Sequence, residues 1–249
     1  MNKIIENAIE RLIQYALKED SRGSGCSASG TEYEYKVHDV VKRCVTSSGE
    51  PFNIQMSSNL GGSSGSPDII CTWNGNPVCI ECKHNAVDWG QSKVDLENGR
   101  WKHKDAHITE ILNQGALFGF KLPPPITDDI LHTDWMIIKR QDNTWNDRYF
   151  DIPSNYIRDF YRSKGCYYIQ INEKGLYHLG DDVCNFGVPE FVIEQKLRVR
   201  VKIHGRTSKK KRFTQVSVMS SYCTDSTTIE SSPYSLDDIA KLPPGLTYI

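Results

Sequence analysis

Two carboxylates and a lysine are spaced so that they could act together on a phosphate ester. Asp68 precedes one β-rich run, and Glu81 and Lys83 lie in the next. Hard divalent cations bind oxygens from one or two carboxylates and leave positions for water and substrate phosphates. A lysine beside such a cation can orient or deprotonate the attacking water and stabilise charge on the phosphate. Asp68 and Glu81 are therefore predicted to bind Mg²⁺, for which Mn²⁺ could substitute, with Lys83 beside it.

A β-hairpin is predicted to bring these side chains together. The runs 69–73 and 78–83 are rich in strand-forming residues, and Asn74-Gly75-Asn76-Pro77 separates them. Asn-Gly supplies the positive φ angles of a tight reversal, so the two runs should pair antiparallel. Residues two apart in a strand share a face, so Glu81 and Lys83 should point the same way. Closure at this turn would bring the acid that precedes the first strand next to them.

The spacing of these residues resembles a known signature. Pro67-Asp68, twelve intervening residues and then Glu81-Cys82-Lys83 are similar to the motif of the PD-(D/E)xK nucleases, the restriction-endonuclease-like superfamily. The resemblance covers about residues 30–140. It implies an α/β fold, in which a mixed central sheet is flanked by helices, and Mg²⁺-dependent hydrolysis of phosphodiesters. A chain of this size most resembles a type II restriction or homing-type endonuclease, and such proteins usually act as homodimers on double-stranded DNA.

The resemblance also implies a third acid. Residues 31–44 carry apolar side chains at helical spacing, and Thr31 is a plausible N-cap. Within this predicted helix, Tyr33-Glu34-Tyr35-Lys36-Val37 is similar to the aromatic-Glu-x-x-Val setting in which the family places an auxiliary acid. Glu34 is therefore expected to be a catalytic residue and metal ligand. Glu32, in the same turn, is the alternative that would only complement the helix dipole.

A cationic strand is predicted near the C-terminus. Between 196 and 204, apolar residues alternate with Lys, Arg and His, so one face should be apolar and the other cationic. Residues 196–212 hold nine Lys and Arg and no acid, so with a total of −1 the rest of the chain carries −10. This segregation is typical of a polyanion site, although a solvated strand with lysines protecting its edge is the alternative. The expected nucleic-acid contacts are Lys196, Arg198, Arg200, Lys202, Arg206, Lys209, Lys210, Lys211 and Arg212.

Composition and cysteine usage place the chain among soluble intracellular proteins, in the cytoplasm, nucleoid or nucleus. No run approaches the roughly 18–20 apolar residues of a membrane span, and charges interrupt the apolar N-terminal residues, which excludes a secretory signal. The eight cysteines show no disulfide spacing and are expected to be mostly free thiols. Cys79 and Cys82 are not a zinc pair, because positions three apart in a strand face opposite ways.

The chain is predicted to contain an N-terminal helix at 1–22, a nuclease core at 23–165 and a β-rich part at 166–249 with a basic hairpin. Ser21–Gly30 and 61–65 are expected to be flexible, and the last 30 or so residues a loose tail. Helices are expected at 3–18, 106–120 and 152–162. Strands are expected at 135–138, 167–171, 176–179, 191–204 and 213–220, with a turn at 205–208.

Two other functions fit parts of the pattern. One is an RNA or single-strand nuclease of the same fold. The other is a nucleic-acid-binding protein that keeps the fold without the chemistry, and the presence of Asp68, Glu81 and Lys83 together argues against it. The recognition sequence and the cleavage pattern have no single-sequence code.

Overall fold

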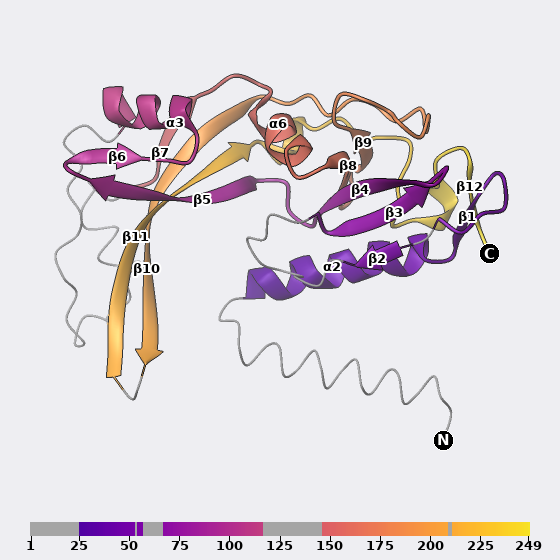
Figure 1. The fold of residues 1–249 in the computed structure, drawn as a ribbon, viewed down its shortest axis with the longest axis horizontal. Coiled ribbons are helices and arrows are strands. Elements are labelled where there is room, and N and C mark those ends of the chain that lie inside the picture. The colour runs from indigo at the N-terminus through magenta and orange to yellow at the C-terminus, as the bar shows by residue number, and fades with distance from the viewer. Residues whose placement is uncertain (1–24, 53, 57–66, 117–145, 209–210) are drawn as a thin grey trace. The chain divides into compact units, whose positions relative to one another are not determined.

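The structure, a computed structural model, describes residues 25–52, 54–56, 67–116, 146–208 and 211–249 (Figure 1). The chain forms two compact units, each assembled from separate stretches. Unit 1 takes the chain through Asn85, then Tyr161–Phe191 and Ile229–Ile249, and unit 2 takes Ala86–Phe160 and Val192–Thr228. These boundaries differ from those expected from composition, because strands far apart in sequence pair within each unit. The predicted α/β class is observed, with strands predominating.

Unit 1 contains a five-stranded mixed sheet. Its strand order is β2-β3-β4-β8-β9, in which β4 and β8 run parallel and every other neighbouring pair is antiparallel. The parallel pair joins two parts of the sequence that are some eighty residues apart, and most of the long connection between them belongs to unit 2. The strands are β2 Ile54–Met56, β3 Ile69–Trp73, β4 Asn76–Lys83, β8 Cys166–Ile171 and β9 Gly175–His178.

The β3–β4 hairpin confirms the predicted turn and register. Asn74 and Gly75 have φ angles of 50° and 75°, the left-handed values that a two-residue reversal needs at both positions. The strands pair antiparallel from Trp73↔Asn76 to Ile69↔Ile80. Ile69 and Ile80 are fully buried, so the pairing register is fixed by the core as well as by the turn.

Helix α2, Gly25–Val41, packs its apolar stripe on the unit 1 core. Tyr33, Val37 and Val41 are buried, whereas Glu32 is exposed. The predicted N-cap at Thr31 is wrong, because the helix begins six residues earlier and Thr31 lies inside it. Residues 25–30, expected to be flexible, form the first part of this helix.

The C-terminal segment is folded, and the prediction of a loose tail is wrong. Strand β12, Leu246–Tyr248, pairs with β1, Cys44–Thr46. Ile229 and Leu236 are also buried in this segment, so some of its few apolar residues are part of the buried interior. Two short 3₁₀ turns, Ser226–Thr228 and Ile239–Lys241, complete it.

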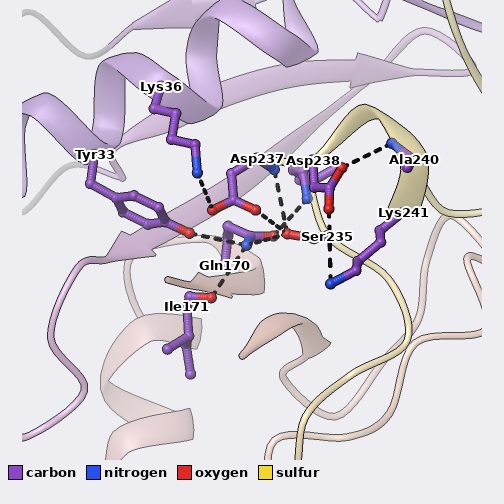
Figure 2. Close-up of polar contacts among 10 residues, drawn as sticks. Tyr33, Lys36, Gln170, Ile171, Ser235, Asp237, Asp238, Ala240 and Lys241 are labelled. Carbon is purple, nitrogen blue, oxygen red and sulfur yellow. Dashed lines mark hydrogen bonds and ion pairs between the residues drawn. The ribbon is translucent and has the colours of Figure 1, made fainter. Parts of the chain in front are cut away.

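A buried glutamine fastens this segment to helix α2 (Figure 2). Gln170 on β8 is fully buried, and its Nε2 donates to Tyr33 Oη at 3.1 Å and Ser235 Oγ at 2.9 Å. Its Oε1 accepts from the Leu236 backbone N–H at 2.9 Å. Lys36 Nζ adds an ion pair to Asp237 at 3.2 Å. The Gln170 side chain therefore joins the helix, the sheet and the C-terminal segment. Its partner on the helix, Tyr33, precedes Glu34 in the sequence.

Unit 2 is built on a second five-stranded sheet, in which all neighbouring strands are antiparallel. The strand order is β6-β5-β11-β10-β7. The strands are β5 Asp88–Glu97, β6 Arg100–Lys102, β7 Arg148–Asp151, β10 Gln195–Ser208 and β11 Lys211–Thr224. Strands β10 and β11 pair with each other along their whole length, to Ser208↔Lys211, which shows that the predicted turn at 205–208 is wrong. The backbone stays in the ladder there because Gly205 pairs with Thr214.

The β10–β11 hairpin extends past its neighbours in the sheet as a two-stranded ribbon (Figure 1). Strand β7 pairs with β10 only from Lys196 to Val199, and β5 pairs with β11 only from Val218 onward. Between Val199 and Val218, β10 and β11 have only each other as described strand partners. This ribbon coincides with the most basic stretch of the sequence.

Helix α6 is shorter than predicted, whereas the other predicted helix begins at Ala106 as expected. Helix α3 covers Ala106–Ile111, with Asp105 Oδ1 accepting from the Ile108 N–H at 3.1 Å as N-cap, and a π-helical turn, Leu112–Ala116, follows. Helix α6 covers Tyr156–Arg162 and so begins later than expected after Pro153. The predicted helix at 3–18, the loop at 61–65, the end of the 106–120 helix and the strand at 135–138 lie outside the described residues.

Candidate active site

The structure brings Asp68, Glu81 and Lys83 together on the β3–β4 hairpin. Lys83 Nζ donates to Glu81 Oε1 at 2.6 Å, as expected for residues two apart on one strand face. Asp68 Oδ2 accepts from the Cys82 backbone N–H at 2.8 Å, which fixes this carboxylate at the end of the hairpin. The side chains of Glu81 and Lys83 are 4% and 20% exposed. The site is therefore largely dry but open to solvent at the lysine.

The charges of the site are strongly coupled. Burial and the neighbouring Glu81 carboxylate raise the pKa of Asp68 to about 6, against the opposing effects of Lys83, the Cys82 N–H and Lys164. Burial alone would lower the pKa of Lys83, but the attraction of Glu81 outweighs it and raises that pKa well above the usual value. Lys83 is thus a cation at neutral pH, whereas Asp68 is poised to lose its proton only near pH 6.

Helix α6 and the turn after it supply two more residues that the sequence did not indicate. The Tyr161 ring is buried, and its centroid lies 5.1 Å from Lys83 Nζ and 5.0 Å from Lys164 Nζ. Lys164 Nζ also lies 3.8 Å from Glu81 Oε2. These residues follow the hairpin by about eighty positions and reach it through the parallel pairing of β4 with β8. No local motif marks that pairing, so the sequence carried no signal for them.

Glu34 on helix α2 lies near the hairpin. Its side chain is buried, and together with burial and Asp68 it raises the pKa of the Cys82 thiol, so it lies near that residue. Cys82 faces away from Glu81 in the strand and packs in the core with Tyr33. The three predicted metal ligands therefore do not form one cluster. Within the described ranges, no three His, Cys, Asp or Glu side chains are grouped so that they could hold a metal.

The pair Asp68 and Glu81 nevertheless fits a hard divalent cation. Among the described residues, the buried Oε2 of Glu81 has no hydrogen-bond partner. Two carboxylates that repel each other strongly enough to raise a pKa gain most from a cation between them. Mg²⁺ is commonly held by one or two carboxylates and completes its shell with water and phosphate oxygens. Asp68 and Glu81 would be its protein ligands here.

Several cations of the predicted nucleic-acid-binding strand are paired with acids of the protein itself. Arg198 donates from Nη1 to Asp88 Oδ2 at 2.7 Å and from Nε to Asp147 Oδ2 at 2.9 Å. Arg200 Nη1 lies 3.6 Å from the same Asp88 oxygen, and Lys196 Nζ lies 3.6 Å from the exposed Asp151. The predicted apolar face is confirmed where it is described, because the alternate residues are buried: Leu197, Val199 and Val201. The side chains of Lys202, Arg206, Lys209, Lys210, Lys211 and Arg212 lie outside the described part.

The cysteines behave as predicted. The seven whose side chains the structure describes are free thiols, and five of them are fully in the core. Cys82 is buried whereas Cys79 is partly exposed, as expected for opposite strand faces. Across the described ranges, none of the helices has the length and apolar character needed to cross a membrane.

Comparison of the chain with models of protein families, with characterised proteins and with solved structures finds no match in any of the three. The function proposed below therefore rests on the chemistry of the hairpin.

Proposed function

We propose that the protein is a metal-dependent endonuclease that hydrolyses phosphodiester bonds in double-stranded DNA. The observation that carries this proposal is the convergence of Asp68, Glu81 and Lys83 at the end of one hairpin, with the lysine 2.6 Å from the glutamate. A solvated charged hairpin, the plain alternative, would leave these groups exposed. Here Glu81 is only 4% exposed, and two acids buried side by side destabilise each other, an arrangement that is found most often at functional sites.

Asp68 and Glu81 would bind Mg²⁺, which when bound supplies Lewis-acid polarisation of the phosphate and a more acidic water. Hydrolysis forms a bond from a water oxygen to phosphorus and breaks the bond to the leaving oxygen, which takes up a proton. Lys83 is a cation held by Glu81, so its direct contribution is to stabilise negative charge on the phosphate and to orient the attacking water. Removal of the water proton by Lys83 is disfavoured, because its raised pKa keeps it protonated.

Duplex DNA is favoured as substrate by the β10–β11 ribbon. The major groove of B-DNA admits a two-stranded β-ribbon, and this one extends beyond the sheet through the most basic part of the sequence. Lys202, Arg206 and Lys209 to Arg212 belong to that part. Arg198 and Arg200 are paired with Asp88 and so belong to the base of the ribbon. A homodimer as the working form follows only from the family resemblance.

The proposal is tested by incubating the chain with plasmid DNA, RNA and single-stranded DNA, each with Mg²⁺ or with a chelator. Expected are Mg²⁺-dependent conversion of supercoiled plasmid to nicked and linear forms and clustered ends on sequencing. Cleavage of RNA or of single strands alone would favour the related nuclease alternative. Binding to DNA without cleavage in any metal would favour the catalytically silent one.

A further inference from the structure

Lys164 is held against the hairpin by the turn that ends helix α6. Its N–H donates to the Tyr161 carbonyl at 3.0 Å, and the next residue, Gly165, donates to the Arg162 carbonyl at 2.9 Å. Gly165 has a φ of 81°, the left-handed value typical of the residue that follows a helix. The chain then enters β8 at Cys166, whose partner on β4 is Cys79. This turn therefore delivers Lys164 to the strand that carries Glu81.

Two lysines share one carboxylate and one aromatic ring. Lys83 lies 2.6 Å from Glu81 Oε1 and Lys164 lies 3.8 Å from Oε2. Their ammonium nitrogens are 5.1 and 5.0 Å from the centroid of the Tyr161 ring, within the distance at which a ring face attracts a cation. Both side chains are mostly buried, 20% and 15% exposed. The two ammonium groups are thus both held beside Glu81 and the Tyr161 ring.

The charges show what such an arrangement would attract. Asp68 and Glu81 are balanced by Lys83 and Lys164 when both acids are ionised. A divalent cation on the acids leaves the four side chains and the cation with a net charge of +2, in a partly desolvated site. A phosphodiester is an anion whose charge grows in the transition state of hydrolysis, and preorganised cations stabilise it most where water is excluded. Lys83 forms the short contact with Glu81, and Lys164 places a second positive charge beside the same carboxylate.

We propose that Lys164 is a second catalytic lysine, which contacts the scissile phosphodiester beside Lys83 and stabilises its charge in the transition state. The inference rests on the proposed function and assigns a residue to the same site. The contact at 3.8 Å is longer than a hydrogen bond, so a phosphate oxygen can replace Glu81 as the near neighbour of Lys164 with little rearrangement. Its position in a turn, rather than in a strand, allows the small shift that this exchange needs.

The test measures kcat and KM for plasmid cleavage by the wild-type chain, Lys164→Gln and Lys164→Arg, with the exposed Lys42→Gln as control. Expected are a fall in kcat of roughly 100-fold for Lys164→Gln with KM changed less than about threefold, and recovery to within about tenfold of wild type in Lys164→Arg. Lys42→Gln should match the wild type. Denaturation midpoints of all four proteins are measured in the same buffer.

The outcomes separate this inference from the function beneath it. Cleavage by Lys164→Gln at the wild-type rate overturns the role of Lys164 and leaves the nuclease proposal intact. A loss of activity that accompanies a lowered denaturation midpoint, and that Lys164→Arg does not restore, means that Lys164 serves only the packing of the folded site, which also overturns it. A wild-type chain that cuts no nucleic acid overturns both proposals.

Discussion

Lys83 Nζ and Glu81 Oε1 lie 2.6 Å apart on one face of strand β4. This contact decides which of the two acids, Asp68 or Glu81, can change its charge more readily. Glu81 is committed to an ion pair, and its attraction raises the pKa of Lys83. Among the described residues, no cation forms an ion pair with Asp68, which accepts from a backbone N–H instead. Asp68 is therefore the acid whose charge, and whose contribution to folding, should respond most to pH and to added cations.

Asp68→Asn should stabilise the metal-free protein at neutral pH. Because the folded pKa of Asp68 is about 6 and its ordinary value is 3.8, its contribution to stability is fully present below about pH 4 and is lost as pH rises through 6. Such a shift corresponds to roughly 2–3 kcal/mol. Asparagine removes the charge and retains an oxygen that can accept from the Cys82 N–H. The measurement is urea denaturation of both proteins in chelator from pH 4 to 7.5.

The free energies of unfolding should converge at pH 4 and separate, in favour of the variant, by pH 7.5. Added Mg²⁺ at pH 7.5 should then stabilise the wild type and leave Asp68→Asn unchanged. If the free energies of unfolding of the two proteins change with pH in the same way, the pKa of Asp68 is not raised by folding.

Glu34 and Glu32 form a matched pair on helix α2, one buried and one exposed. Glu34 lies near Cys82, and within the described residues it forms no three-ligand group with Asp68 and Glu81, so we expect it to act on the metal site from outside the ligand shell. Glu34→Gln should lower Mg²⁺ affinity by about 10–100-fold, the usual effect of such a partner. Glu32→Gln should leave it unchanged. Calorimetric titration of Mg²⁺ checks this, and equal affinities for the two variants would exclude any part for Glu34.

Gln170→Ala should release the C-terminal segment. The side chain is fully buried and bonds to Tyr33, Ser235 and the Leu236 N–H, so its loss leaves several buried polar groups without a partner. A cost of about 2–4 kcal/mol is expected. Hydrogen exchange should accelerate across residues 229–249 first. The control is Lys36→Gln, which removes an ion pair at a lysine that is 56% exposed and should cost less than about 1 kcal/mol. Unchanged exchange in Gln170→Ala would show that the segment is held by its apolar residues alone.

The cations of strand β10 should divide into a structural group and a DNA-binding group. Arg198→Gln strips both Asp88 and Asp147 of their shared guanidinium partner, so it should lower the free energy of unfolding by about 1–3 kcal/mol. Lys196→Gln, whose lysine and partner acid are 60% and 95% exposed, should change stability little. Neither should alter DNA binding.

Replacing Lys202 and Arg206 by Gln on the ribbon should weaken binding to all duplex sequences alike. Each lost phosphate contact should shallow the dependence of log affinity on log salt by about 0.9, so two should give a change of about two units. Fluorescence anisotropy with Ca²⁺ in place of Mg²⁺ measures this without cleavage. An unchanged slope in the double variant would place the DNA elsewhere on the protein.

Local chemistry explains which parts of the fold could be predicted. The β3–β4 hairpin followed from Asn74-Gly75, and the face shared by Glu81 and Lys83 followed from strand geometry. A second Asn-Gly pair, Asn98-Gly99, has φ angles of 50° and 75° and turns β5 into β6, and it was the signal that could have identified this hairpin. The polar composition of residues 88–102 obscured it, because that sheet edge is largely exposed.

Long-range pairing explains most of what was missed. The parallel pairing of β4 with β8 brings Tyr161 and Lys164 to the site, and no local pattern specifies which distant strand pairs with which. The C-terminal segment was predicted to be loosely ordered because its buried residues are few and separated by serines and prolines. Its order comes from Gln170, a lone polar residue within the apolar run of β8. The pairing of Arg198 with Asp88 and Asp147 was likewise invisible, because these acids come from separate parts of the chain.

The most direct test of the central claim is plasmid cleavage by the wild type and Glu81→Gln in Mg²⁺, with Glu32→Gln as the matched control. Glutamine keeps the size of Glu81 but removes the charge that a metal and Lys83 both require. If Glu81 is a ligand of a catalytic metal, we expect Mg²⁺-dependent cleavage by the wild type and by Glu32→Gln. The rate should be at least 1,000-fold lower for a folded Glu81→Gln protein that still binds DNA. Cleavage by Glu81→Gln at the wild-type rate would contradict it.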